Sequence, residues 1–292
     1  MDKILLFNAT GAQGTTISHR LLEKDYKVIS PVRSEKNISI LHERNIEAFL
    51  TDFSIRSLLP IIEKADKVVL QIPAAVVPDI MAEIASNAID AISMAGNPKT
   101  VFVISSTIPK LPIGVRSVDV RLKMVELARG KMPDTPILSS TEYLENFSTA
   151  YRQPIMENGV IPQTIPPGFQ VNYLSWSDLA AYVLAALESD KLTGGKVYQI
   201  GGNRGMNGIE LAERMGRVLG KQLAYVPISH KQLEKILTPI MGAEVAKDYA
   251  EFYHWQDTEG ASLLNPDTEA LRNLLSVNLP SFEVWAERAF FG

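Results

Sequence analysis

The chain has 292 residues, 46% of them hydrophobic, which is enough for a substantial core in one large domain or two smaller ones. Its 29 basic and 33 acidic residues give a net charge of −4, so no basic surface for nucleic acid or a membrane is expected. The absence of cysteine excludes disulfides, thiolate metal sites and a cysteine nucleophile.

The first predicted element is an apolar strand over residues 3–7, followed by a small-residue turn and a helix over residues 13–23. In doubly wound folds this order presents a helix N-terminus to a phosphate group. The usual fingerprint has three glycines, whereas here Asn8 takes the first position and Gly11 and Gly14 take the other two. Because asparagine tolerates a positive φ, the turn is still available. The segment therefore predicts a nucleotide site.

Short segments rich in Val, Ile and Leu then alternate with helical segments up to about residue 140. These strands lack a polar–apolar alternation, as expected for strands covered by helices on both faces. Repetition of strand and helix predicts a parallel sheet. The expected strands are residues 27–32, 46–50, 67–72, 100–105 and 135–140, and the expected helices are residues 35–43, 54–64, 77–95 and 119–129.

After residue 142 the pattern changes to one with more helices and loops. We predict an α/β fold in which a doubly wound parallel Rossmann sheet carries a smaller, mostly helical C-terminal substrate lobe. Residues 1–142 would form the nucleotide-binding domain, with strand and helix returns near 175–202, and residues 143–292 the lobe, interleaved with the sheet. The cleft between them, at the carboxyl ends of the strands, is the expected ligand site. The expected elements are helices at 143–150, 175–188, 209–219, 231–253 and the C-terminal end, strands at 196–200 and 223–226, and a loop-rich stretch at 155–171.

Arg33 ends the second predicted strand, about 20 residues after the glycine turn, where an acidic residue would bind the ribose hydroxyl of NAD. An arginine at this place can instead pair with the 2′-phosphate of NADP, and Lys36 can assist. The alternative is a solvated arginine on a loop. Given the glycine turn, the pattern favours NADP.

Polar residues also follow the later strands. Asp52 could accept a hydrogen bond from the adenine amine or cap the next helix. Gln71, Ile72 and Pro73 end the fourth strand, where the chain must pass the cofactor, and Ser105 ends the fifth, where its hydroxyl would reach a nicotinamide or a substrate. All of these are also ordinary turn residues.

The sequence resembles the NmrA-like group of atypical short-chain dehydrogenase/reductases. The resemblance is carried by residues 8–14, Arg33, residues 51–53, Lys123, residues 143–147 and residues 175–180, although the family usually has glycine in place of Asn8. It covers most of the chain and implies a Rossmann fold that binds NADP(H). The family contains both reductases and non-catalytic NADP(H)-binding regulators. The binding residues it implies are Asn8, Thr10, Gly11, Gln13, Gly14, Arg33, Lys36, Asp52, Phe53, Gln71, Ile72, Pro73, Lys123, Tyr143, Leu144, Glu145 and Asn146.

Ordinary short-chain dehydrogenases use a Tyr-x-x-x-Lys dyad, but none of the nine tyrosines here has a lysine four residues later. Carbonyl reduction by that dyad is therefore not expected. By itself Lys123 is an exposed helix lysine, whereas the resemblance implies that it contacts the ribose or donates a proton. An aromatic cluster at residues 252–255 could be core or could line a pocket, with Tyr253 or His254 as proton donor. The four histidines lack metal-ligand spacing, so no metal is expected.

We therefore expect an NADPH-dependent reductase that transfers hydride to a small apolar, quinone-like, enone or imine substrate. The alternative is a non-catalytic NADP(H)-binding redox sensor. The expected partner is a small-molecule substrate, and neither a nucleic acid nor a membrane is expected. A homo-oligomer is possible, but the sequence does not indicate the oligomeric state. No secretory signal and no apolar run near the ~20 residues of a membrane span is evident, which favours a cytoplasmic protein.

Overall fold

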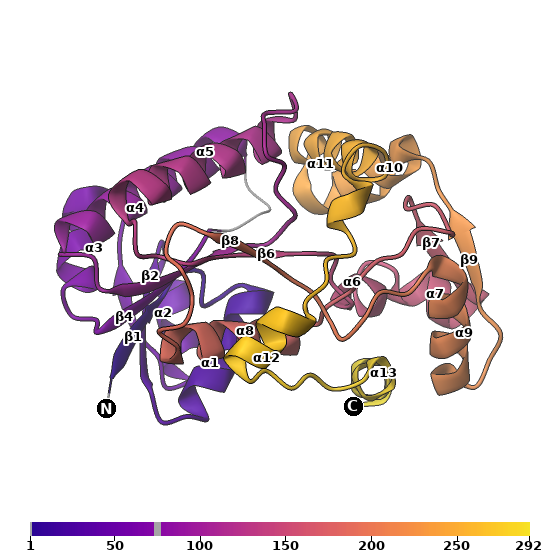
Figure 1. Cartoon of the computed structure of the whole chain (residues 1–292), viewed down its shortest axis with the longest axis horizontal. Coiled ribbons are helices and arrows are strands. Elements are labelled where there is room, and N and C mark those ends of the chain that lie inside the picture. Colours follow the sequence, from indigo (N-terminus) through magenta and orange to yellow (C-terminus); the bar gives the residue numbers. More distant parts are fainter. Residues whose placement is uncertain (1, 73–76) are drawn as a thin grey trace.

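The protein is built around a parallel sheet of seven strands, seen in a computed structural model that describes residues 2–72 and 77–292 (Figure 1). The strand order is β3-β2-β1-β4-β5-β6-β8. The order reverses between β1 and β4, and a doubly wound sheet forms its ligand crevice at such a point. The strands are β1 (Lys3–Leu6), β2 (Lys27–Val32), β3 (Glu47–Leu50), β4 (Lys67–Gln71), β5 (Lys99–Ile104), β6 (Ile137–Ser140) and β8 (Val197–Ile200).

Helices cover both faces of this sheet and bury alternate side chains of each strand. In β1, Ile4 and Leu6 belong to one core cluster, whereas Leu5 belongs to the other. This explains why the strands are apolar without alternation. The predicted doubly wound fold is confirmed. One face carries α1 (Ala12–Leu22), α2 (Glu35–His42), α8 (Trp176–Glu188) and α12 (Glu269–Leu275), and the other carries α3 (Ile55–Ile62), α4 (Pro78–Met94) and α5 (Arg116–Lys131).

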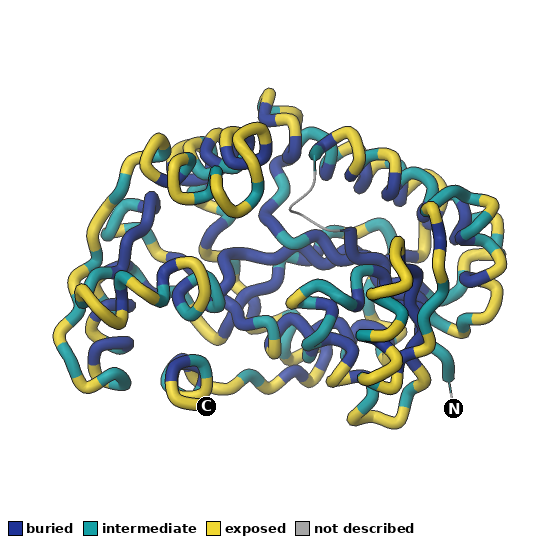
Figure 2. The backbone as a smooth tube through the Cα atoms, turned by 180° about the vertical axis from the view of Figure 1, so that it is seen from behind, coloured by how far each residue is buried: buried dark blue, intermediate teal, exposed yellow. Residues whose placement is uncertain are grey.

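The rest of the chain forms a lobe with its own apolar core, which includes Phe147, Leu211 and Trp285. Figure 2 shows the contrast between the buried backbone of the central sheet and the more exposed turns of the outer helices. No helix within the described residues is both long and apolar enough to cross a membrane. The lobe contains α6 (Glu145–Ser148), α7 (Arg152–Asn158), β7 (Val160–Gln163), α9 (Gly208–Leu219), β9 (Ala224–Pro227), α10 (His230–Met241), α11 (Ala243–Gln256), η1 (Ala261–Leu263) and α13 (Phe282–Phe291).

The stretch at residues 155–171 is more ordered than the sequence predicts. It contains the end of α7 and all of β7, which pairs in parallel with β9 in a separate two-stranded sheet. Pro162 lies in β7 opposite Val226. Proline lacks an N–H donor and is tolerated in a strand only where a ladder hydrogen bond can be lost, as at a sheet edge. This proline is one of the residues for which the sequence favours a loop here, together with the Asn158-Gly159 turn and the breakers at residues 166–168.

Helix α5 begins at Arg116, three residues before the predicted start at residue 119. The Asp119 carboxylate accepts hydrogen bonds from the backbone N–H of Ile113 at 2.8 Å and of Gly114 at 3.0 Å. These bonds fix the loop that precedes the helix. As a result, the helix begins about one turn before Asp119. The same early turn of α5 packs against α11 through Val118 and Phe252, which brings the lobe over the carboxyl edge of the sheet.

Candidate functional site

The glycine turn between β1 and α1 has the backbone geometry that its residues predict. Asn8 has a φ of +62°, and its carbonyl oxygen accepts a hydrogen bond from the Gly11 N–H at 2.9 Å. A Cβ at Gly14 would lie 2.0 Å from the Asn8 carbonyl oxygen, so only glycine allows α1 to approach the turn this closely. Thr10 lies within the turn, and Gly11, the N-cap of α1, has no side chain to cap the helix, so the first N–H groups of α1 are open to an anionic group.

Side chains from three segments meet beside this turn. The Gln13 side-chain oxygen accepts hydrogen bonds from the Ser105 hydroxyl at 2.7 Å and from the Gln71 amide. Gln71 is 1% exposed at the end of β4, and Ile72 beside it is also buried. These contacts join α1, β4 and β5 at the carboxyl edge of the sheet. Pro73, predicted to contact the cofactor, lies outside the described residues.

At the far side of the turn, Arg33 is exposed at the end of β2, and its guanidinium lies over the Phe53 ring, 5.3 Å from the ring centroid. Lys36 is exposed nearby in α2. Asp52 accepts hydrogen bonds from the Ser57 hydroxyl at 2.6 Å and from the Ser54 N–H at 2.9 Å. The first of these bonds is the main reason that the pKa of Asp52 is lowered to about 2.

Ser54 itself is the N-cap of α3, because its hydroxyl accepts a hydrogen bond from the Ser57 N–H. Asp52 therefore supports the start of this helix without being its N-cap residue. Its exposed carboxylate is still present at the edge where the sequence places an adenine contact. The predicted capping role is therefore wrong in its residue, since Ser54 is the N-cap, whereas the adenine contact stays a prediction.

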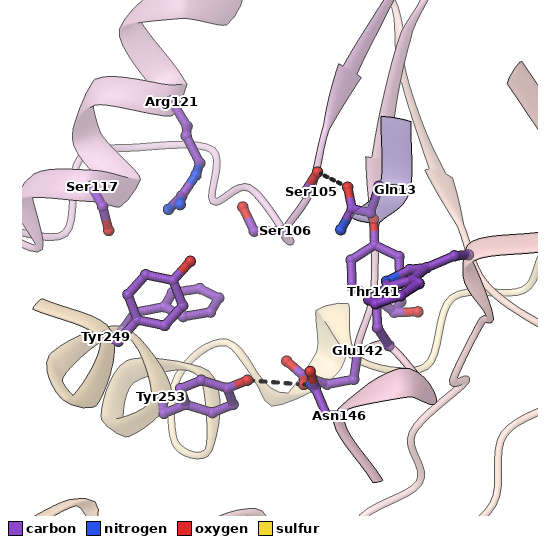
Figure 3. A pocket seen from close by; sticks show the side chains of 13 residues that line it. Gln13, Ser105, Ser106, Ser117, Arg121, Thr141, Glu142, Asn146, Tyr249 and Tyr253 are labelled. Carbon is purple, nitrogen blue, oxygen red and sulfur yellow. Dashed lines mark hydrogen bonds between the residues drawn. The ribbon is translucent and has the colours of Figure 1, made fainter. Parts of the chain in front are cut away.

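A cavity of about 170 Å³ adjoins the glycine turn at the carboxyl ends of β5 and β6 (Figure 3). Helix α5, which covers the sheet, and helix α11 of the lobe both contribute side chains to its walls. Its lining combines hydroxyl and aromatic side chains with one arginine and one glutamate. The lining residues are Gln13, Ser105, Ser106, Ser117, Arg121, Thr141, Glu142, Tyr143, Asn146, Trp176, Tyr249, Phe252 and Tyr253.

Glu142 is the centre of a hydrogen-bond cluster on one wall of this cavity. Its carboxyl group accepts hydrogen bonds from the Tyr253 hydroxyl at 3.0 Å, the Gln256 amide at 2.7 Å and the Asn146 amide at 3.4 Å. Burial raises the pKa of Glu142 above its ordinary value, and burial also raises the pKa of the Tyr253 phenol. Glu142 was not predicted from the sequence, although an acidic residue two positions after a buried strand at the expected cleft was a usable signal.

The predicted cofactor segment from Tyr143 to Asn146 divides between two surroundings. Tyr143 and Asn146 line the cavity. Leu144 packs in the core of the lobe. The Glu145 carboxylate accepts hydrogen bonds from the Trp176 N–H at 3.0 Å and the Trp285 indole N–H at 3.1 Å, and burial raises its pKa to about 7. The side chains of Leu144 and Glu145 therefore make structural contacts and do not line the cavity.

The hydroxyl of Tyr143 is buried, and it has no hydrogen-bond partner among the described residues. Burial raises the pKa of this phenol, so it remains protonated at neutral pH. A buried polar atom without a partner that faces a cavity is where a bound molecule would be recognised. Tyr143 is therefore the predicted residue whose position points most directly to a ligand.

Two predicted proton donors lie away from the cavity. Lys123 is exposed on α5 and is absent from the lining, whereas Arg121, which the sequence analysis did not select, is 5% exposed and lines the cavity. Two residues along a helix correspond to a rotation of about 200°, so the two side chains project from opposite faces. His254 is exposed and faces His230, with ring centroids 5.0 Å apart, whereas its neighbour Tyr253 lines the cavity.

Comparison with known proteins gives a family and several similar folds. The NmrA-like family model matches residues 1–274. The triphenylmethane reductase of Citrobacter sp. is similar, with a TM-score of 0.80 and 20% identity, covering 99% of this chain and 99% of that chain. The NADPH-dependent quinone oxidoreductase of Escherichia coli, complexed with NADPH, gives a TM-score of 0.78 at 20% identity, covering 98% of this chain and 99% of that chain.

The negative transcriptional regulator NmrA is also similar, with a TM-score of 0.72 and 15% identity, covering 99% of this chain and 95% of that chain. No curated protein matches the sequence. At these identities the structural likeness establishes a shared fold.

Proposed function

The chain belongs to the NmrA-like family, and from that membership and the geometry of the site we propose that it is an NADPH-dependent reductase of small unsaturated acceptors. The observation that supports this proposal most is the cavity beside the glycine turn, which three tyrosines and a buried glutamate line at the carboxyl ends of β5 and β6. Two of the proteins with a similar fold, from Citrobacter sp. and Escherichia coli, are reductases or oxidoreductases that carry NADP(H) or NADPH in their structures.

Residues of this chain fit the cofactor along the edge of the sheet. The glycine turn and the open N-terminus of α1 would bind the pyrophosphate, and Arg33 with Lys36 would bind the 2′-phosphate. Phe53 and Asp52 would contact the adenosine end, and Gln13 and Ser105 lie where the nicotinamide end would enter the cavity. NADPH, when bound, supplies a hydride.

The cavity limits the acceptor to a small molecule. Ligand pockets for drug-sized molecules usually have volumes of about 300–1,000 Å³, and this cavity has about 170 Å³. Trp176, Phe252 and Tyr249 contribute aromatic surface to the lining. A planar quinone-like, enone or imine acceptor would fit this environment, and the aromatic side chains around it would reduce the access of water to the reacting atoms.

The Tyr253–Glu142 pair is our candidate for the proton source that replaces the missing Tyr-x-x-x-Lys dyad. The Tyr253 hydroxyl donates to Glu142 at 3.0 Å, and burial raises both pKa values. A proton is therefore held on the pair at neutral pH, and a general acid within reach of an acceptor can transfer it. Tyr143, whose hydroxyl has no partner among the described residues, would orient the acceptor.

Turnover with a panel of quinones, enones and imines tests the proposal, with NADPH oxidation followed by its absorbance. We expect Tyr253→Phe to lower kcat about 100-fold or more, in the range typical of a lost general acid, without changing the affinity for NADPH. The control is Tyr26→Phe, which removes a hydroxyl that donates to Glu188 on the surface at 3.0 Å. Tight NADPH binding with no turnover of any acceptor would refute the reductase.

That same outcome would favour the second candidate, a non-catalytic NADP(H)-binding redox sensor. The observation that favours a sensor is that none of the nine tyrosines is followed four residues later by a lysine, as in the Tyr-x-x-x-Lys dyad of ordinary short-chain dehydrogenases. In a sensor, the cofactor's redox state would change affinity for a partner. Different melting temperatures with NADP⁺ and NADPH, in the absence of turnover, would be its signature.

A further inference from the structure

We propose that the cavity recognises a small acceptor that carries a carboxylate, and that Arg121 binds this carboxylate. The inference rests on the proposed function for the identity of the reaction, but the recognition of the carboxylate stands on the cavity alone. Its basis is a buried guanidinium that faces the cavity, together with unpartnered hydroxyl groups beside it.

Arg121 is 5% exposed, and within the described ranges no carboxylate lies close enough to form an ion pair with it. Asp248, on the neighbouring helix α11, instead accepts a hydrogen bond from the Ser117 N–H at 3.1 Å. A buried charge is costly unless it is paired, and burial accordingly lowers the pKa of Arg121. Asp248 and the Tyr249 hydroxyl stabilise the charge of Arg121 only in part, since burial still lowers its pKa, and a bound anion would supply the rest of the counter-charge.

Hydroxyl donors surround the guanidinium. Ser117 lies one helical turn before Arg121 on the same face of α5, and Ser106 follows β5 (Figure 3). Both serine hydroxyls are buried and have no hydrogen-bond partner among the described residues. In Figure 3 the Arg121 side chain extends toward Ser106 and Tyr249, so that its donors and the hydroxyls converge on one end of the cavity.

This set of donors suits a carboxylate. A guanidinium presents parallel N–H groups that match the two oxygens of a planar carboxylate, and serine hydroxyls can donate to the remaining lone pairs. Glu142 lies on another wall of the same cavity. Burial raises the pKa of Glu142, which disfavours its charged form and so weakens its repulsion of a negative charge at the Arg121 end. Among the lining residues that the structure describes, Glu142 is the one acidic side chain, so a cationic ligand would have one candidate for an ion pair.

The remaining lining indicates what is attached to the carboxylate. Phe252, Tyr249 and Trp176 supply aromatic surface, and the Tyr253 hydroxyl lies at Glu142, on another wall from Arg121 (Figure 3). Planar rings are favoured against aromatic side chains. The acceptor class is therefore a small aromatic or conjugated carboxylate, with the unsaturated bond beside the tyrosines and the carboxylate at Arg121.

Three probes of the same shape and different charge test this inference by calorimetry: benzoate, benzamide and benzamidinium. Each is titrated into the full chain with and without saturating NADP⁺. We expect benzoate to bind about tenfold or more tightly than benzamide, and benzamidinium to bind more weakly than either. Arg121→Gln and Arg121→Met should weaken benzoate by about 10- to 100-fold and leave benzamide unchanged.

The matched control is Arg129→Gln, which removes an exposed arginine two turns along the same helix and should leave benzoate binding within about twofold. Equal binding of benzoate and benzamide, no benzoate binding to the wild-type chain, or benzoate affinity that survives both Arg121 variants would overturn the inference. If a variant does not fold, the three probes on the wild-type chain still decide. Arg121-dependent benzoate binding without NADPH turnover would retain this inference and refute only the reductase.

Discussion

Replacing Arg33 with alanine tests the assignment of the cofactor's 2′-phosphate. Arg33 is exposed, its guanidinium lies 5.3 Å from the centroid of the Phe53 ring, and it forms no ion pair with any other described residue. The aromatic stack holds the guanidinium in place while its donors remain open to solvent. It is therefore free to bind a phosphate without first breaking an ion pair.

The size of the effect follows from these contacts. A hydrogen bond to a charged group contributes about 1.5–3 kcal/mol, which corresponds to a 10- to 150-fold loss of NADPH affinity in Arg33→Ala. NADH has no 2′-phosphate, so its affinity should change less than about twofold. Within the folded protein the substitution removes an exposed cation–π stack on Phe53, and such a stack contributes about 0.5–1 kcal/mol to stability. The variant should therefore fold normally.

Binding of NADPH and NADH is measured by fluorescence titration for the wild type, Arg33→Ala and Arg33→Lys. Lysine keeps the charge but loses the paired donors, so it should recover part of the NADPH affinity. Arg20→Ala is the control, because Arg20 is exposed on α1 and pairs with Glu23 at the end of the same helix. An equal loss for NADPH and NADH, or no loss for either, would refute the 2′-phosphate assignment.

Three further predictions concern the turn, the lobe and α5. Gly14→Ala should lower the free energy of unfolding by about 1–3 kcal/mol and weaken NADPH binding, because the new Cβ would meet the Asn8 carbonyl oxygen at 2.0 Å; an unchanged melting temperature would contradict this. Because folding raises the pKa of Glu145 to about 7, its contribution to stability should be lost as the pH rises from 5 to 8, by roughly 1–3 kcal/mol, and Glu145→Gln should abolish that part of the pH dependence in denaturant titrations. Lys123→Ala should leave NADPH affinity and turnover unchanged, because Lys123 is exposed and outside the cavity lining; a tenfold loss of either would restore its predicted role.

Local sequence signals predicted the elements at the nucleotide end of the chain well. The strand, the glycine turn and the helix that begins near Gln13 depend on interactions within about 15 residues, and the positive φ of Asn8 is a property of that residue and its neighbours. The fold and the family inferred from these signals are confirmed. The parallel pair of β7 and β9 was missed because the partners lie more than 60 residues apart and Pro162 argues against a strand.

The sequence alone determined that this chain folds as a doubly wound sheet with a glycine turn between its first strand and its first helix, because strand and helix periodicity and turn chemistry are encoded over short distances. Only the tertiary structure decided which side chains face the cavity. In helix α5, Arg121 lies on the buried face with Val118 and Val125, whereas Lys123 is exposed. Packing of α5 against α11 through Val118 and Phe252 places Arg121, and not Lys123, in the lining of the cavity. The same packing brings Tyr253 to Glu142, 111 residues earlier in the chain, and so creates the site.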